Sequence, residues 1–217
     1  KPYITVQNPT HYGEFLIKTP WVISDATASW NWDGMEGKPA IVEVYAQGDE
    51  VELFLNETSL GKKPAGKEAG FRTLFETTYE PGTLVAVSYE NGQEIGRSEL
   101  ATAGAERVLA VEQEAYAGLK HSEQELVYVQ VEMRDQNGVL AADDNQKITL
   151  SVDGEVEVLG FGSGNPKPNY NFNEGVTELF GGRAQIIIKK PEEDVTLTVT
   201  TGDGVCGSIR VPGGANF

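Results

Sequence analysis

Apolar residues alternate with polar ones, or form short continuous runs, along almost the whole chain. Both patterns are typical of β-strands, and no stretch keeps the period of a helix. In the first half they predict five strands, at residues 40–46, 51–55, 71–79, 83–90 and 94–102. Asn91-Gly92 lies between the last two, and this pair is a strong hairpin signal because both central residues of such a turn need positive φ.

The strand pattern starts again after residues 102–106. It predicts seven further strands, at residues 108–113, 126–135, 147–152, 155–162, 183–190, 195–201 and 206–211. This spacing predicts an all-β chain of two tandem antiparallel β-sandwiches, each with about seven strands. We place the first sandwich at residues 29–104 and the second at residues 105–217. Residues 1–28 fit neither pattern well, and we interpret them as a lead-in segment from something upstream.

Composition restricts the partners of the chain. It has 217 residues, of which 33 are acidic and 17 basic, so that its net charge is −16. Such a surface repels nucleic acid and anionic lipid, and we expect neither nucleic acid nor membrane as a partner. The charge is spread evenly over both halves, which is typical of a soluble surface. Cys206, the single cysteine, cannot form an internal disulfide and indicates no compartment.

Two glycine-rich stretches resemble nucleotide-binding loops. Residues 61–68, "GKKPAGKE", nearly match a phosphate-binding P-loop, but Glu68 stands where a hydroxyl is needed and a strand pattern follows. We therefore predict a flexible hairpin loop with lysines in water. Residues 160–168, "GFGSGNPKP", cannot begin the helix that a dinucleotide site requires, because two prolines follow the glycines. A glycine-rich bend between strands is the favoured interpretation.

The sequence gives no catalytic residue, no metal ligand set and no cofactor. Thirty-three acidic residues make a chance carboxylate pair unavoidable, so pairing alone does not indicate a glycosidase. The oxygen-rich stretches 135–138 and 142–146 lack EF-hand spacing and predict solvated turns. His11 and His121 lie far apart without a Cys or His cluster, whereas zinc needs three or four ligands. Asn56-Glu57-Thr58 is formally a glycosylation sequon, whose role the sequence leaves open.

Trp30 and Trp32 are the candidate contact residues. They alternate in "SWNWDGMEGKP", so on an extended chain both rings point to the same face. Such a pair suits a platform for a sugar, or a wedge that packs inside the domain or against a neighbouring one. Each ring buries roughly 200 Å² when it packs, and exposing two of them is unfavourable, so we favour packing.

Long phrases of the chain resemble one family. "ASWNWDGMEGKPAIVEVYAQGDEVELFLNETSLGKKPAG" and "YEPGTLVAVSYENGQEIGRSELATAG" are similar to the first C-terminal β-sandwich of bacterial glycoside hydrolase family 2 enzymes of the β-galactosidase type. "LVYVQVEMRDQNGVLAADDNQKITLSVDGEVEVLGFGSGNPKPNYNF" is similar to the immunoglobulin-like module that follows in that family, and "KPYITV" resembles the exit from the catalytic barrel. One departure is Glu57, since the family usually has Gly there. Glu disfavours positive φ, and we expect the turn to differ.

The resemblance implies two tandem immunoglobulin-like sandwiches that accompany a catalytic barrel upstream. It implies hydrolysis of β-glycosides by two barrel glutamates, neither of which can be assigned to a position of this chain. We interpret the chain as a non-catalytic accessory region whose partner is its own upstream barrel and which shapes substrate access. The alternatives are an independent carbohydrate-binding module and an adhesin-like immunoglobulin tandem. The substrate sugar, the compartment and the oligomeric state do not follow from the sequence.

Overall fold

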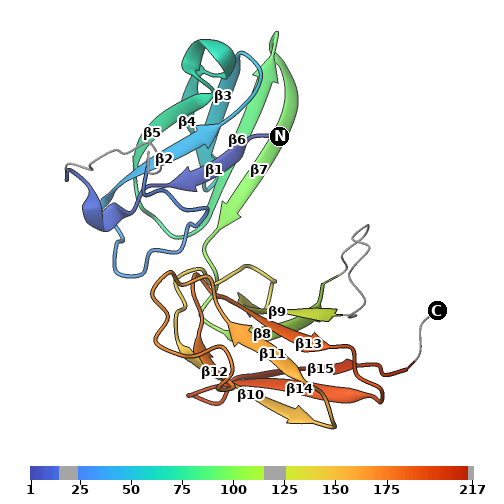
Figure 1. Cartoon of the computed structure of the whole chain (residues 1–217). Helices are drawn as coiled ribbons and strands as arrows, with labels where there is room; N and C mark the ends of the chain where they lie inside the picture. Colours follow the sequence, from blue (N-terminus) through green and yellow to red (C-terminus); the bar gives the residue numbers. More distant parts are fainter. Residues whose placement is uncertain (15–23, 115–125, 215–217) are drawn as a thin grey trace. The chain divides into compact units, whose positions relative to one another are not determined.

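The chain consists of two compact units, Lys1–Thr102 and Ala103–Phe217. The computed structural model describes residues 1–14, 24–114 and 126–214 (Figure 1). Every pair of named strands is antiparallel, and two short 3₁₀ helices, η1 (Pro9–His11) and η2 (Gly66–Ala69), are the helical elements among these residues. The predicted all-β class is confirmed. Along the chain, the first unit ends at Thr102 and the second begins at Ala103.

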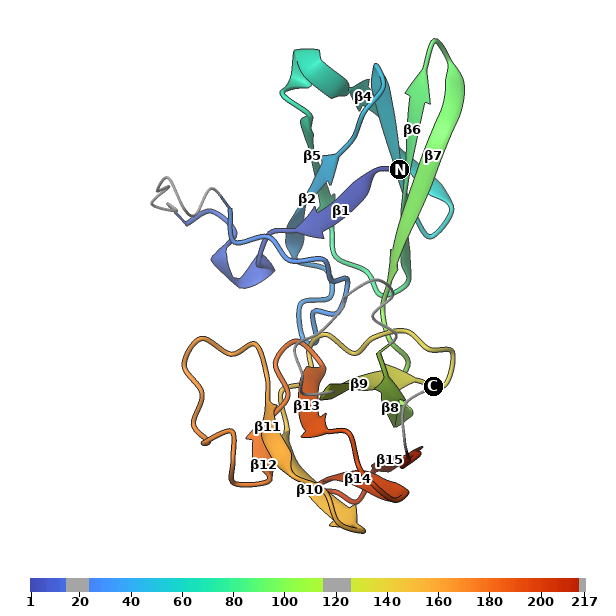
Figure 2. The ribbon, with the colours of Figure 1, turned by 45° about the vertical axis from the view of Figure 1, so that its right-hand side comes forward.

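The first unit is a sandwich of a three-stranded and a four-stranded sheet. Its strands are β1 (Tyr3–Val6), β2 (Pro39–Tyr45), β3 (Glu50–Leu55), β4 (Thr58–Pro64), β5 (Arg72–Thr78), β6 (Thr83–Glu90) and β7 (Gln93–Ala101). The sheet orders are β1-β2-β5 and β4-β3-β6-β7. Lettered A to G with β4 as C′, these are A-B-E and C′-C-F-G, which is an immunoglobulin-like arrangement. Figure 2 shows β6 and β7 as one long hairpin.

Two of these strands were not expected from the sequence. Tyr3–Val6 lies in the segment interpreted as a lead-in, but it pairs with β2 and buries Ile4 and Val6 in the core. A four-residue strand is too short for its alternation to stand out. The flexible loop predicted at residues 61–68 is wrong: its first half belongs to strand β4, which pairs with β3, and its second half begins the 3₁₀ helix η2. Both lysines of β4 contact other residues. The Nζ atom of Lys62 lies 3.8 Å from the centre of the Tyr89 ring, and the Nζ atom of Lys63 donates a hydrogen bond to the Leu74 carbonyl at 2.8 Å.

Alternation along the strands builds the core of the first unit. Val51, Leu53 and Leu55 of β3 point inward, while the residues between them are partly exposed. They meet Val42 and Val44 of β2. Because successive side chains of a strand point to opposite faces, a period of two places one whole set between the sheets.

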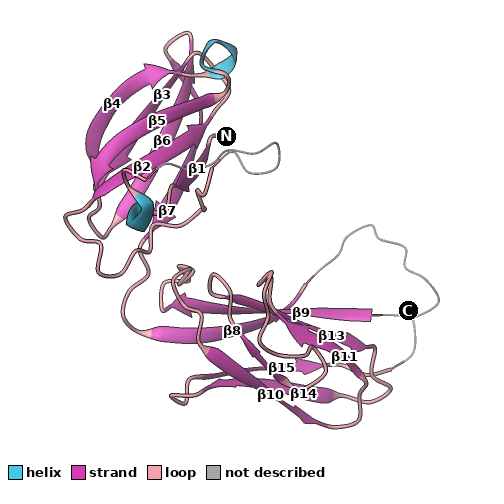
Figure 3. Ribbon diagram, turned by 60° about the vertical axis from the view of Figure 1, so that its left-hand side comes forward, coloured by secondary structure: helices cyan, strands magenta, loops and turns pink. Residues whose placement is uncertain are grey.

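The second unit is a sandwich of two four-stranded sheets. Its strands are β8 (Arg107–Gln113), β9 (Leu126–Asp135), β10 (Lys147–Asp153), β11 (Val158–Gly162), β12 (Val176–Glu178), β13 (Arg183–Lys189), β14 (Val195–Thr201) and β15 (Cys206–Val211). The sheet orders are β11-β13-β9-β8 and β12-β10-β14-β15. The first order corresponds to D-E-B-A and the second contains C-F-G, as in immunoglobulin domains. Figure 3 shows the two layers of this unit.

Inward residues of both layers form a separate core. Val129, Val131 and Met133 of β9 are fully buried and pack with Ile186 and Ile188 of β13. The residues between them therefore face outward, and Gln130 lies beside Gln185 on the outer face of this sheet. Strand β12 was not expected, since three residues carry too little pattern to predict a strand.

Candidate functional site

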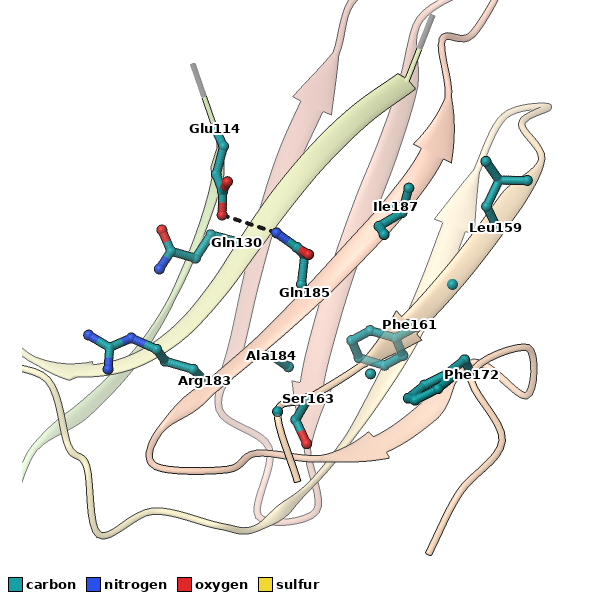
Figure 4. A pocket seen from close by; sticks show the side chains of 13 residues that line it. Glu114, Gln130, Leu159, Phe161, Ser163, Phe172, Arg183, Ala184, Gln185 and Ile187 are labelled. Carbon is teal, nitrogen blue, oxygen red and sulfur yellow. Dashed lines mark hydrogen bonds between the residues drawn. The ribbon is translucent and has the colours of Figure 1, made fainter. Parts of the chain in front are cut away.

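A groove lies on the outer face of the sheet β11-β13-β9-β8. Its volume is about 550 Å³, and it is lined by the apolar side chains Leu159, Phe172 and Ile187, by polar ones that include Gln130 and Gln185, and by glycines of β11. Figure 4 shows that Leu159 and Phe172 stand on the β11 side of this groove, whereas Gln185 and Ile187 rise from β13. A volume in this range suits a small molecule. We call this site the β11 groove.

Glycines of β11 create the hollow. The pairing of β11 with β13 shifts register between Val158 and Gly160, so the strand is irregular there. At Gly160 an added Cβ would meet no atom within 4 Å, which means that the missing side chain leaves open space. At Gly162 an added Cβ would lie 2.3 Å from Cδ1 of Phe172. Glycine is therefore required at 162 for the Phe172 ring to rest against the strand.

Phe172 forms the aromatic wall. Half of its surface is exposed, and its carbonyl oxygen accepts a hydrogen bond from the N–H of Phe161 at 2.8 Å. This bond and the contact with Gly162 hold the exposed ring at the edge of the groove. An aromatic ring with one open face offers a flat apolar contact surface to a ligand.

Two amides form the polar part of the floor. Gln185 Nε2 donates to a carboxylate oxygen of Glu114 at 3.2 Å, and Gln130 Nε2 donates to Glu132 at 2.7 Å. An ionised carboxylate only accepts hydrogen bonds, so each amide must turn its nitrogen toward it. The carbonyl oxygen of Gln185 consequently points away from Glu114 (Figure 4).

Glu132 anchors the charged end of the same face. It accepts hydrogen bonds from Arg134 at 2.7 Å and from Arg183 at 2.9 Å. Burial would raise the pKa of Glu132, but these two arginines outweigh burial and hold its pKa below the usual range. Arg183, the only cation among the described residues that line the groove, is thus paired.

A second buried carboxylate, Glu43, lies on β2 of the first unit. Its side chain is fully buried and accepts hydrogen bonds from Gln7 at 2.7 Å, Ser24 at 2.6 Å, Tyr45 at 2.7 Å and Arg72 at 2.6 and 2.9 Å. Burial alone would raise the pKa of Glu43, but the bonds, with that from Arg72 strongest, lower it to about 2. A carboxylate held ionised in this way does not serve as a general acid at neutral pH.

The predicted contact residues Trp30 and Trp32 lie away from the β11 groove, in the first unit. Trp30 is completely buried; its ring meets the Tyr79 ring edge-on at 4.8 Å, and its indole N–H donates to the Glu80 carbonyl at 3.0 Å. Trp32 is half-buried and packs against the same core. A carbohydrate or interdomain contact at these residues stays a prediction.

The other sequence candidates are dispersed. His11 pairs with Asp25 at 2.9 Å, whereas His121 lies outside the described residues. Asp135 accepts backbone N–H bonds from Gly104, Asn137 and Val139, and so holds a turn. Within residues 1–14, 24–114 and 126–214, no three His, Cys, Asp or Glu side chains are grouped as a metal site would need. No helix in these ranges is long and apolar enough to cross a membrane.

The residues of the β11 groove were not singled out from the sequence. The stretch "GFGSG" was interpreted as a bend, and outward glutamines on strands are common. One signal was available: the outward positions of β9 and β13 can be read from their alternation. That Phe172 lies over Gly162 could not be read, because it depends on the path of the loop between β11 and β12.

Both structural units contain a segment that matches a known family model. Residues 111–208 match the family model described as glycoside hydrolase family 2 C-terminal domain 5. Residues 37–96 match a domain described only as of unknown function, DUF4982. The two matches fall in different structural units.

Curated relatives are longer enzymes. The chain is 28% identical to Beta-galactosidase BoGH2A of Bacteroides ovatus over 182 aligned residues. The aligned part is 81% of this chain and 21% of the relative. It is 32% identical to a putative beta-glucuronidase of Formosa agariphila over 165 aligned residues. The aligned part is 74% of this chain and 16% of that relative. The chain thus spans about a fifth or less of the length of these relatives.

Solved structures agree in fold. A glycosyl hydrolase family 2 member from Bacteroides cellulosilyticus aligns with a TM-score of 0.83 and 25% identity over 97% of this chain and 28% of that one. A beta-glycosidase from Bacteroides vulgatus aligns with a TM-score of 0.72 and 25% identity over 86% of this chain and 24% of that one. Together the fold and these matches define a tandem of immunoglobulin-like sandwiches. The chain matches the C-terminal β-sandwich region of family 2 glycoside hydrolases, and the resemblance seen in the sequence is confirmed.

Proposed function

We propose that this chain is a non-catalytic accessory region of a β-galactosidase-like glycoside hydrolase, that it packs on the catalytic barrel of that enzyme and that it shapes substrate access. The observation that carries the proposal is the extent of the matches: the relatives are glycosidases, and this chain corresponds to only 21% and 16% of two of them. Most of the length of these enzymes, where a catalytic domain has room, lies outside the matched part.

The carboxylates of the described residues support a non-catalytic role. A retaining glycosidase needs one carboxyl group with a raised pKa as the acid and a second about 5 Å away as the nucleophile. The two buried glutamates, Glu43 and Glu132, have lowered pKa values and belong to different units. Arg72 holds Glu43, and Arg134 and Arg183 hold Glu132. These arginines favour the ionised form of each carboxyl group and leave it unsuited to donate a proton.

The test compares this chain with a full-length enzyme that contains it. On aryl β-galactosides and aryl β-glucuronides we expect turnover by the enzyme and none by the 217-residue chain above buffer. Deletion of the chain from the enzyme should lower the melting temperature of the remaining barrel, because apolar surface that packs on these domains becomes exposed to water. Hydrolysis by the isolated chain that is lost on mutating one of its own acids would overturn the proposal. The proposal would also be overturned if the deletion changed neither the melting temperature of the barrel nor its KM.

A further inference from the structure

The β11 groove has the chemistry of a sugar-binding site, and we infer that it binds the ring of a neutral saccharide. This inference does not rest on the proposed accessory role, since a sandwich can bind a sugar whether or not a barrel precedes it. It concerns other residues than Trp30 and Trp32.

The groove is apolar on one side and polar on the other. Phe172 presents an exposed ring at the β11 edge, and Ile187 adds an apolar floor beside it. Across the groove the carbonyl oxygen of Gln185 points away from Glu114 and is placed to accept a hydrogen bond (Figure 4). A pyranose has the same division, because its C–H groups cluster on one face while its hydroxyl groups radiate from the ring edge. Stacking on Phe172 and donation to Gln185 can therefore occur together.

The recognition elements are held in place before a ligand arrives. Gly162 lets the Phe172 ring lie against β11, and the Phe172 carbonyl is tied to the N–H of Phe161 at 2.8 Å. Glu114 fixes the amide of Gln185 by the bond at 3.2 Å. Groups that are already ordered lose less conformational entropy on binding, which matters for a small ligand whose total binding energy is low.

Charge distinguishes a neutral sugar from an acidic one. Two charged side chains line the groove among its described residues, the acid Glu114 and the base Arg183, and their charges sum to zero. Arg183 is already paired with Glu132 and extends away from Phe172 (Figure 4). The whole chain has a net charge of −16, which disfavours an anionic ligand. A uronic acid would bring its carboxylate beside Glu114 without a cation to receive it.

The open space above Gly160 allows a sharp test. Gly160 lines the groove, a Cβ added there would meet no other atom within 4 Å, and its φ is not positive. Gly160→Leu should therefore fill the groove and leave the fold intact. Gly202→Leu is the matched control: it also has open space and no positive φ, but it follows β14 and does not line the groove.

The experiment titrates the 217-residue chain with methyl β-D-galactopyranoside and methyl β-D-glucopyranoside, followed by saturation-transfer and amide-shift NMR. We expect a dissociation constant of about 1 mM for at least one of them, as suits a small ligand with few contacts. Amide shifts should concentrate on residues 159–164 and 183–187. Gly160→Leu should weaken binding by about tenfold or more, and Gly202→Leu by less than about twofold. Methyl β-D-glucuronide should bind several times more weakly than the neutral sugars.

Several results would overturn the inference. One is the absence of saturation transfer from any neutral sugar; another is an equal effect of the two leucine substitutions. A preference for the glucuronide would refute the charge argument. If no sugar binds and Gly160→Leu instead weakens the packing of this unit on a barrel in the full-length enzyme, the groove is a protein contact and the inference is wrong. Melting curves of both variants verify that each remains folded, and the hydrolysis assay of the proposed function is unaffected by any of these outcomes.

Discussion

Asn56 and Glu57 form the two-residue turn between β3 and β4, and both have positive φ, 48° and 67°. The expectation that Glu in place of Gly would change this turn was wrong. The side chain of Asn56 accepts a hydrogen bond from the N–H of Thr83 at 2.9 Å and donates one to the Pro81 carbonyl at 3.2 Å. These bonds to a neighbouring segment hold the turn in its conformation. Glu57 keeps the left-handed conformation because its neighbours impose it.

That conformation has a cost that can be measured. A non-glycine residue in the left-handed region is destabilised by roughly 1 kcal/mol. Replacing Glu57 by glycine removes this destabilisation. Glycine also raises the conformational entropy of the unfolded chain, which offsets part of the gain in stability. We expect Glu57→Gly to stabilise the first unit by about 0.5–1 kcal/mol in urea unfolding. Gly92→Glu is the reverse control: Gly92 has the same role after Asn91 between β6 and β7, and the change should destabilise by a similar amount. A destabilising Glu57→Gly would contradict the argument.

Glu43 gives the first unit a dependence on acid. Its pKa is about 2 in the folded chain against an ordinary 4.5. A group whose pKa is lower in the folded than in the unfolded state stabilises the fold. This contribution is fully present above the pKa of the unfolded state and is lost as pH falls toward the pKa of the folded state. The difference corresponds to about 3 kcal/mol, lost between pH 4.5 and pH 2.

Glu43→Gln tests this contribution. At pH 7 the variant should be less stable by on the order of 3 kcal/mol, because Arg72 keeps its charge in a partly buried site without a partner. By pH 2 the gap to the parent chain should narrow, since Glu43 itself is then half protonated. Urea unfolding at both pH values measures it. The exposed Glu76 on β5 provides a control, because Glu76→Gln should change little at either pH. A constant gap across this range would refute the linkage.

At the scale of elements, a segment without strand structure closes one end of the first sandwich. Residues 29–32 run between the end of β5 and the end of β7: the carbonyl of Trp30 accepts from Thr102 Oγ1 at 2.6 Å, and the N–H of Trp32 donates to the Tyr79 hydroxyl at 3.2 Å. The Trp30 ring is fully buried and packs with the core of the first unit. The segment thus ties the two sheets together at this end.

Trp30→Ala should therefore cost about 3–5 kcal/mol, as expected for truncating a large buried aromatic side chain. Trp32→Ala should cost less, because Trp32 is only half-buried. Urea unfolding followed by circular dichroism compares the two variants. If Trp32→Ala proved the more destabilising, the relative burial of the rings would not be what decides their contribution.

At the scale of the whole molecule, the two cores are separate clusters, one in each unit. Trp30 and Trp32, the two tryptophans that the structure describes, both pack with the core of the first unit, so their fluorescence reports the first unit. Ile186→Ala removes fully buried volume from the second core and should cost about 2–5 kcal/mol.

In a thermal melt of this variant we expect an unchanged fluorescence midpoint and a lower midpoint for part of the circular dichroism signal. Leu53→Ala, in the first core, is the control that should move the fluorescence midpoint. Should Ile186→Ala lower both signals together, the two units would unfold as one cooperative body and the separation of cores would not govern stability.

The class of fold and most of the strands follow from the local pattern of the sequence. The strands at residues 126–135, 195–201 and 206–211 were predicted with the bounds that the structure has. Alternation suffices there because a half-buried strand repeats every two residues, and this signal is local. The long family-like phrases likewise identified the enzyme class whose C-terminal region the chain matches.

Tertiary structure alone decided the rest. β1, β4 and β12 are strands because a partner strand pairs with them, and Glu57 keeps a left-handed turn because Asn56 is held by the loop before β6. The β11 groove brings together Phe172, Gly162 and Gln185, which lie on three different segments. Such contacts depend on distances through space between residues far apart in the chain, and neither periodicity nor turn chemistry carries that information.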